Sequence, residues 1–198
     1  MTATKAKRLT RVESRARTRM RIIEAATALF LRGGFQATSL EQVAEEAGYT
    51  VGAVYSNFES KTAVGVAVID ELYAAEEQRL AELLAKVPDG DTDGVFDALS
   101  SWADSTIGDP GWTRLEIEIA AFSAHEESYR AATAARYARL RVSCRELIAG
   151  RIGGDSQLDP DLLAAAIVGL ALGIGAQRAA DPRIPGRTWS EALRALVR

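Results

Sequence analysis

The sequence predicts an all-α protein. Apolar residues recur at intervals of three and four along most of the chain, the spacing that places them on one face of a helix. Glycine, proline and capping residues divide this pattern into separate segments, and no run alternates as a half-buried strand would. Apolar residues at 47% and charged residues at 26% of 198 are typical of a folded globular chain.

The first helix is expected over residues 18–32. Ile22, Ala26 and Phe30 lie on one face of it, and a pair of glycines follows as a stop. Residues 1–17 carry many charges but little apolar periodicity. We expect them to form a flexible basic arm.

Three more helices are expected in close succession. Capping-box spacing occurs at both Thr38 and Ser39, so the second begins there, and Gly48 ends it. The hydroxyl of Thr50 can cap a third helix that runs to about residue 57. Ser60 can cap a fourth, long helix that reaches residue 86.

A turn-rich stretch at residues 87–94 separates these helices from the remainder. Apolar stripes of helical spacing follow within residues 95–103, 115–122 and 137–148. Pro160 lies between two aspartates, which predicts a helix start because proline fits the first helical position and acids there favour the helix dipole. That helix is expected to reach residue 180, and a last one to cover 188–198.

The charges are distributed unevenly. Residues 1–21 hold eight Lys or Arg and one acidic residue, a net of +7, and residues 1–61 have a net of +4. The remaining 137 residues have a net of −7, so the whole chain is at −3. A basic end on an acidic body is expected where one end of a protein meets a polyphosphate.

Residues 38–61 have the composition of a helix-turn-helix. A recognition helix must come close to base edges, and the small residues after Thr50 allow that. A glycine inside a helix costs about 1 kcal/mol relative to alanine, and close approach to DNA would explain one there. The stretch also offers hydroxyls, a methyl surface and side chains that can reach phosphates, and its helix N-termini can bind phosphate oxygens. The predicted DNA contacts are Thr38, Ser39, Thr50, Val51, Gly52, Tyr55, Asn57 and Lys61.

Residues 18–61 resemble the N-terminal DNA-binding domain of the TetR/AcrR transcriptional regulators. The resemblance rests on Ile23-x-x-Ala26, Phe30, Gly34-Phe35, Thr38, Val43-Ala44-x-x-Ala47-Gly48, Gly52, Tyr55-x-x-Phe58 and Lys61. It implies a homodimer that binds a near-palindromic DNA operator, usually as a repressor released by a small-molecule effector. Val51 and Asn57 depart from the family, which often has lysine and histidine there, and both departures remove possible phosphate contacts.

The resemblance implies that residues 62–198 bind the effector and form the dimer. In residues 160–180 large apolar residues form one helical face and small ones another, so the helix must be buried on both. We expect the small face to pack with the last helix against a second copy, although a wholly internal helix would also fit. The predicted interface residues are Ala166, Gly169, Gly173 and Leu193.

The effector site is less defined by the sequence. Large aromatic residues that could line a pocket, or simply fill the core, are Trp102, Trp112, Phe122 and Tyr137. Glu116 and Glu118 could pair with a cationic ligand, or lie on a solvated face. Cys144, the single cysteine, falls on an apolar stripe and is expected to be unreactive.

Other classes of protein fit the sequence less well. It has one histidine, one cysteine and no Gly-rich phosphate loop, metal-ligand spacing or nucleophile elbow, so we expect no enzyme, metal or cofactor. The longest apolar run, of fifteen residues, is short for a membrane span. A single cysteine and no signal-peptide pattern favour the cytoplasm. A helical protein–protein adaptor, or a small enzyme without a known motif, remains an alternative.

Overall fold

The computed structural model describes residues 10–123, 126–153 and 158–197, and in these ranges all regular structure is helical, as predicted. His125 and the first nine residues of the predicted arm lie outside the described residues. The helices are α1 (Arg11–Gly33), α2 (Leu40–Ala47), α3 (Val51–Tyr55), α4 (Lys61–Leu84), α5 (Thr92–Thr106), α6 (Pro110–Ser123), α7 (Glu127–Leu147) with a π-helical end η1 (Ile148–Ile152), α8 (Pro160–Ala180) and α9 (Thr188–Leu196).

Helix α1 begins earlier than predicted. Thr10 and Glu13 form a reciprocal capping box, in which the Thr10 hydroxyl accepts from the Glu13 amide at 3.2 Å and the Glu13 carboxylate accepts from the Thr10 amide at 2.7 Å. This pair satisfies two N–H groups at the start of a helix. The prediction of a flexible arm is therefore wrong for residues 11–17, which form an exposed, basic helical extension.

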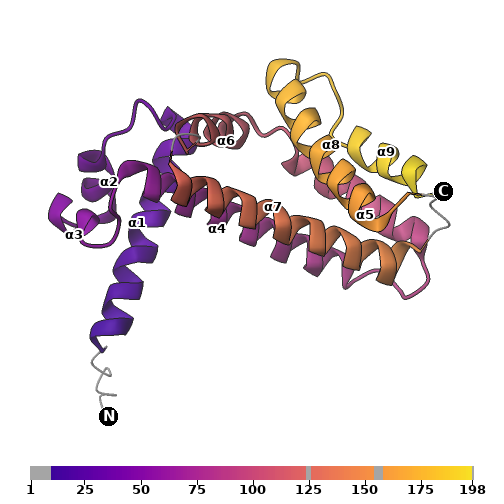
Figure 1. Cartoon of the computed structure of the whole chain (residues 1–198), viewed down its shortest axis with the longest axis horizontal. Coiled ribbons are helices and arrows are strands. Elements are labelled where there is room, and N and C mark those ends of the chain that lie inside the picture. Colours follow the sequence, from indigo (N-terminus) through magenta and orange to yellow (C-terminus); the bar gives the residue numbers. More distant parts are fainter. Residues whose placement is uncertain (1–9, 124–125, 154–157, 198) are drawn as a thin grey trace, which may run out of the picture.

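Helices α1, α2 and α3 form a compact unit at one end of the molecule, here called the head (Figure 1). Ser39 caps α2 in a capping box with Gln42. Gly48 ends α2 in the left-handed conformation, with φ of 73°, which glycine adopts at little cost. This turn sets the angle at which α3 leaves α2.

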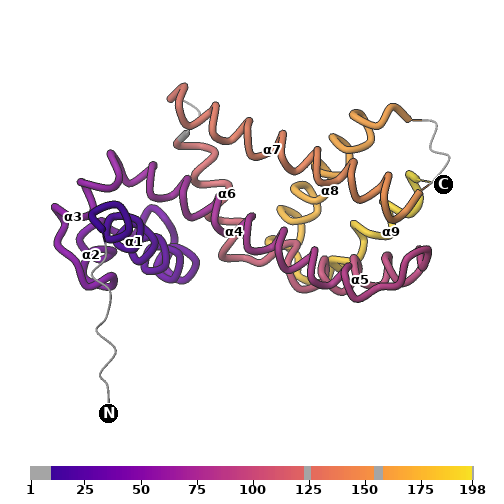
Figure 2. Tube along the Cα trace, turned by 90° about the horizontal axis from the view of Figure 1, so that it is seen from below, coloured from indigo at the N-terminus to yellow at the C-terminus, as the bar shows by residue number. Residues whose placement is uncertain are grey.

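Helix α4 leads out of the head and runs lengthwise through the molecule alongside α7 (Figures 1 and 2). Helix α6 lies close to the head, whereas α5, α8 and α9 gather at the far end. We call α4 to α9 the body. The body thus touches the head through α4, α6 and the start of α7.

Two separate clusters of buried side chains hold the chain together. The first fills the head and includes Val64 and Ile69 of α4 and Leu115 and Ile119 of α6. The second lies between α5, η1, α8 and α9. The predicted boundary between residues 61 and 62 therefore falls inside the first cluster, because the first turns of α4 complete the packing of the head.

Helix α8 uses its large apolar face within its own chain, as predicted. Leu163 and Ile167 are buried, and α8 packs on α6, α7 and α9. By length and composition it could also cross a membrane, but a core helix of a globular protein passes the same test. Asp159 caps it, accepting from the amides of residues 161 and 162 at 2.9 and 3.1 Å.

Helix α9 does not offer Leu193 to a second copy. Leu193 is 1% exposed and lies in the second cluster with Trp189 and Val197, because the apolar stripe of α9 packs on α5 and α8 of the same chain. The predicted interface role of Leu193 is thus wrong. Gly169 and Gly173 of α8, by contrast, do not belong to this cluster.

Candidate functional site

Helix α3 is the exposed element of the head. The Thr50 hydroxyl caps it by accepting from the Ala53 amide at 3.2 Å, and Thr50 itself is exposed. Gly52 is also exposed, and a side chain added there would meet only the Thr50 hydroxyl, at 3.8 Å. Because nothing in the described chain requires glycine at this position, its helix cost points to a surface outside the chain.

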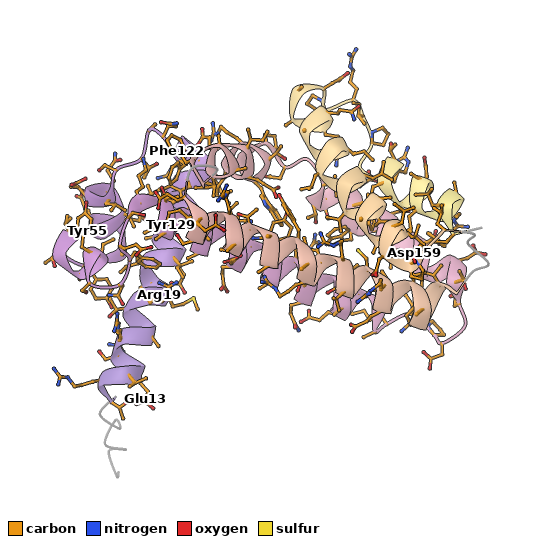
Figure 3. The ribbon with its side chains drawn as sticks, viewed as in Figure 1. Glu13, Arg19, Tyr55, Phe122, Tyr129 and Asp159 are labelled. Carbon is orange, nitrogen blue, oxygen red and sulfur yellow. The ribbon has the colours of Figure 1, made fainter. Side chains whose placement is uncertain are left out.

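Tyr55 and Lys61 lie beside a shallow groove next to α3. The groove is lined by the loop before α2, by Tyr55, and by the residues that open α4. Tyr55 is 56% exposed, which excludes a core role, and it lies at the outer edge of the head (Figure 3). The Lys61 ammonium donates to the Gln36 carbonyl at 3.1 Å and lies 4.6 Å from the centre of the Phe35 ring. Partial burial lowers the pKa of Lys61, and the charge of Glu118 opposes that shift.

Ser39 and Val51 have intermediate exposure near this surface. Ser39 lines the same groove while capping α2. Val51 packs partly against the core of the head and leaves part of its surface open. Both remain available at the edge of the head, although each already has a structural contact.

Thr38 and Asn57 make contacts within the chain instead. Thr38 is 5% exposed, and its hydroxyl donates to the Gly34 carbonyl at 2.8 Å. The Asn57 amide donates to the Ala53 carbonyl at 2.8 Å, at the end of α3. Their side chains shape the loop before α2 and the end of α3, so the prediction that they reach DNA is not supported by this geometry.

Two arginines of α1 hold the end of α3, a role that the sequence pattern did not predict. Arg15 and Arg19 donate to the carbonyls of Ser56 and Asn57, at 3.2 and 3.3 Å. The Arg19 guanidinium also lies 4.1 Å from the centre of the Phe58 ring. Cations near the last carbonyls of a helix are favourable. Arg15 falls in the predicted basic arm, residues 1–17, and Arg19 in the predicted first helix, and both contact the end of α3.

Helix α6 joins the head to the body. The Glu118 carboxylate accepts from the amides of Phe35 and Gln36 at 2.8 and 3.3 Å, and Arg114 donates to the Leu31 carbonyl at 3.2 Å. Tyr129, at the start of α7, shares a 2.7 Å hydrogen bond with Ser60. Helix α6 therefore holds the end of α1 and the loop before α2, and α7 holds the residue that caps α4.

The body encloses a cavity of about 410 Å³ between α4, α5, α6, α7 and α8. This volume falls in the range of small-molecule sites. Trp102 and Trp112 line it, as predicted, and Trp189 lines it too. Phe122 does not line it: it is 42% exposed and lies 5.6 Å from the ring of Phe35, near the head.

A buried polar cluster adjoins the cavity at the head side. Tyr73 and Tyr137 donate hydrogen bonds to the Glu116 carboxylate, at 2.5 and 3.3 Å. Tyr73 and Glu116 line the cavity. Tyr137, which was predicted to line it, does not, and contacts it only through Glu116. Burial raises the pKa of Glu116, and the tyrosine hydrogen bonds and the charge of Arg136 reduce that shift. Burial and the charge of Glu116 raise the pKa of Tyr137 to about 12. Glu116 is thus no solvated carboxylate.

Two family sequence models match the chain. The model of bacterial regulatory proteins of the tetR family matches residues 22–68, and the model of the C-terminal part of BetI-type transcriptional repressors matches residues 92–198, more than half of the chain. The chain belongs to the TetR family. It is therefore a transcriptional regulator built from a helix-turn-helix head and a helical body.

Curated relatives of this TetR-family chain match about a third of it. The HTH-type transcriptional repressor NemR of Escherichia coli is 39% identical over 67 residues, 34% of this chain and 34% of NemR. The HTH-type transcriptional regulator TtgR of Pseudomonas putida is 39% identical over 65 residues, 33% of this chain and 31% of TtgR. The matches span about a third of these relatives.

Solved structures of similar proteins cover nearly the whole chain. NalD, the secondary repressor of the MexAB-OprM multidrug efflux pump in Pseudomonas aeruginosa, is 26% identical with a TM-score of 0.61, over 93% of this chain and 98% of NalD. A TetR-family regulator from Rhodococcus sp. is 16% identical with a TM-score of 0.71, over 92% of this chain and 100% of its own, a likeness of fold alone.

Cys144 of the TetR-family chain lines the cavity instead of filling a sealed core. Burial raises the pKa of its thiol to about 11, and the charge of Glu77 adds to that shift. A thiol with so high a pKa is a poor nucleophile at neutral pH. The predicted lack of reactivity thus has a physical cause in the structure.

The small residues of α8 form an open face. Gly169 and Gly173 are exposed, and a side chain added at either would meet no atom of the described chain within 4 Å. Ala166, beside them, has intermediate exposure. Leu162 extends the face and is 58% exposed. A helix can approach such a face closely.

Proposed function

We propose that this TetR-family regulator is a repressor that binds an operator in double-stranded DNA through α3. The observation that carries the proposal is the exposed, open backbone at Gly52 between Thr50 and Tyr55. Thr50 and Val51 would face base edges, whereas Tyr55, Lys61 and the groove beside them would hold a phosphate. Such a role on the chromosome would place the protein in the cytoplasm.

The repressor would act as a homodimer joined through α8. The exposed stripe of Gly169, Gly173 and Leu162 supports this arrangement, because an apolar helix face needs a cover. Two heads related by a two-fold axis would then enter successive major grooves of a near-palindromic site.

The dimer can be tested with a matched pair of arginine variants. Gly169→Arg places a charge on the proposed interface, and Gly150→Arg places one at a helical glycine whose added side chain would also meet nothing within 4 Å. Analytical ultracentrifugation should show a monomer for the first and a dimer for the second. A dimer that survives Gly169→Arg would exclude this interface.

A small-molecule effector in the cavity would release the DNA. The cavity lies against α6, through Trp112 and Glu116, and two other residues of α6 bind the end of α1 and the loop before α2. It also lies against α4, which begins at the groove beside α3. A ligand that shifts either helix would change the spacing of the two heads, and with it the affinity for DNA.

The DNA-binding proposal can be tested by selection. Purified protein should enrich a small set of genomic fragments, and sequencing of those fragments should reveal a shared near-palindrome. Gly52→Leu should abolish the enrichment while leaving helical circular dichroism unchanged, because the chain itself has room for the side chain. If wild-type protein enriches no fragment, an adaptor or an enzyme is the better account.

A further inference from the structure

The wall of the cavity has an unusual charge. It is aromatic and aliphatic over most of its area, yet carboxylates line it and no Lys, Arg or His does within the described ranges. Of these carboxylates, Glu146 is exposed, and Glu76 and Glu116 have partners in the chain. Glu77 also lines the cavity, and the structure places no hydrogen bond or ion pair on it among the described residues.

The partners of Glu76 and Glu116 account for both groups. Glu76 pairs with Arg79 at 2.7 Å and accepts from the Trp102 indole and the Thr106 hydroxyl, each at 3.0 Å. Glu116 accepts from two tyrosine hydroxyls near the Arg136 guanidinium. Neither needs a further donor to be satisfied.

Glu77 lies one helical turn from Tyr73, where α4 faces Cys144 of α7. Its Oε1 atom is buried and has no hydrogen-bond partner among the described residues, nor does the structure place an ion pair on this carboxylate there. A buried carboxylate oxygen without a partner costs free energy. Natural proteins keep such a group where it has a task.

We propose that the cavity binds a lipophilic monocation, such as a quaternary ammonium, phosphonium or protonated amine with an aromatic or branched apolar body, and that Glu77 is its counter-ion. The inference rests on the proposed function, because it names the ligand class of the proposed effector site. Rings of Trp102, Trp112 and Tyr73 line the same wall, and aromatic faces attract desolvated cations. An anion would meet the carboxylates without any cation on the described wall to offset them.

The charge requirement can be tested with two probes of nearly the same shape. Tetraphenylphosphonium and tetraphenylborate differ in the sign of their charge while sharing four phenyl groups. Isothermal titration calorimetry on the full chain should give a dissociation constant for the phosphonium at least about tenfold lower than for the borate. Equal affinities, tighter binding of the borate, or no binding of either ion would overturn the proposal.

The role of Glu77 can be tested with two glutamine variants of α4. Glu77→Gln keeps the size of the side chain and removes its charge, so it should weaken phosphonium binding about tenfold or more. Glu71→Gln makes the same change at an exposed position of the same helix, and should leave the affinity within about twofold of wild type. If both variants bind like wild type, Glu77 is not the counter-ion.

Thermal stability separates this role from a structural one. Without ligand, Glu77→Gln should raise the melting temperature by about 2 °C or more, because it replaces a half-buried carboxylate whose buried Oε1 atom has no hydrogen-bond partner among the described residues. With saturating phosphonium, wild type should gain more stability than the variant. If Glu77→Gln lowers the melting temperature of the free protein, the carboxylate supports the fold and the proposal fails.

The DNA selection described above is independent of these experiments. If the protein enriches operator fragments but binds the two ions equally, the proposed function stands and the proposed ligand class is rejected. If it binds the phosphonium through Glu77 but enriches no fragment, the cation site stands and the proposed DNA-binding function is rejected.

Discussion

The head and the body bury their side chains in different ways. In the head, Phe30 and Val54 are fully buried in a filled core, and the hydroxyl of buried Thr38 bonds to backbone. In the body, mostly half-buried side chains, carboxylates among them, line a cavity of about 410 Å³. A filled core fixes one geometry, which suits the reading of DNA. A cavity leaves free energy to be gained from a ligand, which suits the sensing of one.

Helix α6 belongs to both regions. Trp112 and Glu116 line the cavity, whereas Arg114 and Glu118, interleaved with them along the helix, bind the end of α1 and the loop before α2. Successive residues of a helix point to different sides, so one rigid element contacts the ligand site and the head at once.

The largest expected effect comes from emptying the core of the head. Phe30→Ala should lower the free energy of unfolding by about 3–5 kcal/mol, because Phe30 is fully buried. Phe122→Ala is the control: its ring also contacts Phe35 but is 42% exposed, so the loss should stay below about 1 kcal/mol. Urea unfolding measures both. Equal losses would mean that the head is not packed as described.

The next largest effect should come from enlarging an alanine, which the filled head and the cavity of the body should tolerate differently. Ala26→Leu should cost about 1–3 kcal/mol through overpacking, because Ala26 is fully buried in the filled head. Ala171→Leu points the same added volume at the cavity wall, and should change stability by less than about 1 kcal/mol while abolishing probe binding in calorimetry. A large loss of stability for Ala171→Leu would show that the cavity is not open space.

A charge change at the groove beside α3 should alter DNA binding moderately. Lys61→Gln should reduce the slope of log affinity against log salt by about 1 per chain, as expected for one lost phosphate contact. Lys86→Gln removes the same charge just beyond the other end of α4, and should leave the slope unchanged. Fluorescence anisotropy across a salt series measures both. Identical slopes for the two variants would remove Lys61 from the interface.

The smallest expected effect is a pH dependence in the body. The folded pKa of Glu116 is raised above its ordinary value of 4.5 by burial, so the folded state holds this proton more tightly than the unfolded state. Its contribution to stability is complete below that value and is lost as the pH rises through the folded pKa. The stability of Glu116→Gln relative to wild type should therefore increase between about pH 4 and about pH 8 in urea unfolding. A constant difference would contradict the burial of this carboxylate.

Local signals in the sequence were enough for most of the fold. The capping box at Ser39, the glycine at 48 and the Asp159–Pro160 start all act through neighbouring residues, so their effects are visible in a short window. The Thr10–Glu13 capping box is a signal of the same kind. The prediction missed it, because residues 11–17 have few apolar residues and a solvated helical extension needs no apolar stripe.

Long-range packing decided the residues that the sequence could not place. Leu193 lies on an apolar stripe of α9 that would fit an internal core as well as a dimer interface. Only the packing of α9 on α5 and α8 shows that this stripe is internal. Phe122 and Trp112 lie on one helix, yet only Trp112 reaches the cavity. The sequence does contain one signal for Glu77. Tyr73, Leu80 and Leu84 recur at helical spacing, and Glu77 is the charged residue that interrupts this apolar stripe.

The central claim is that the head reads a DNA sequence, and one ratio tests it most directly. It is the dissociation constant for a scrambled fragment divided by that for the selected fragment, measured by anisotropy at about 150 mM salt. We predict a ratio of about 10³ or more, the range of specific DNA-binding proteins, with Gly52→Leu reducing it towards 1. A ratio near 1 for the wild-type protein would contradict the account.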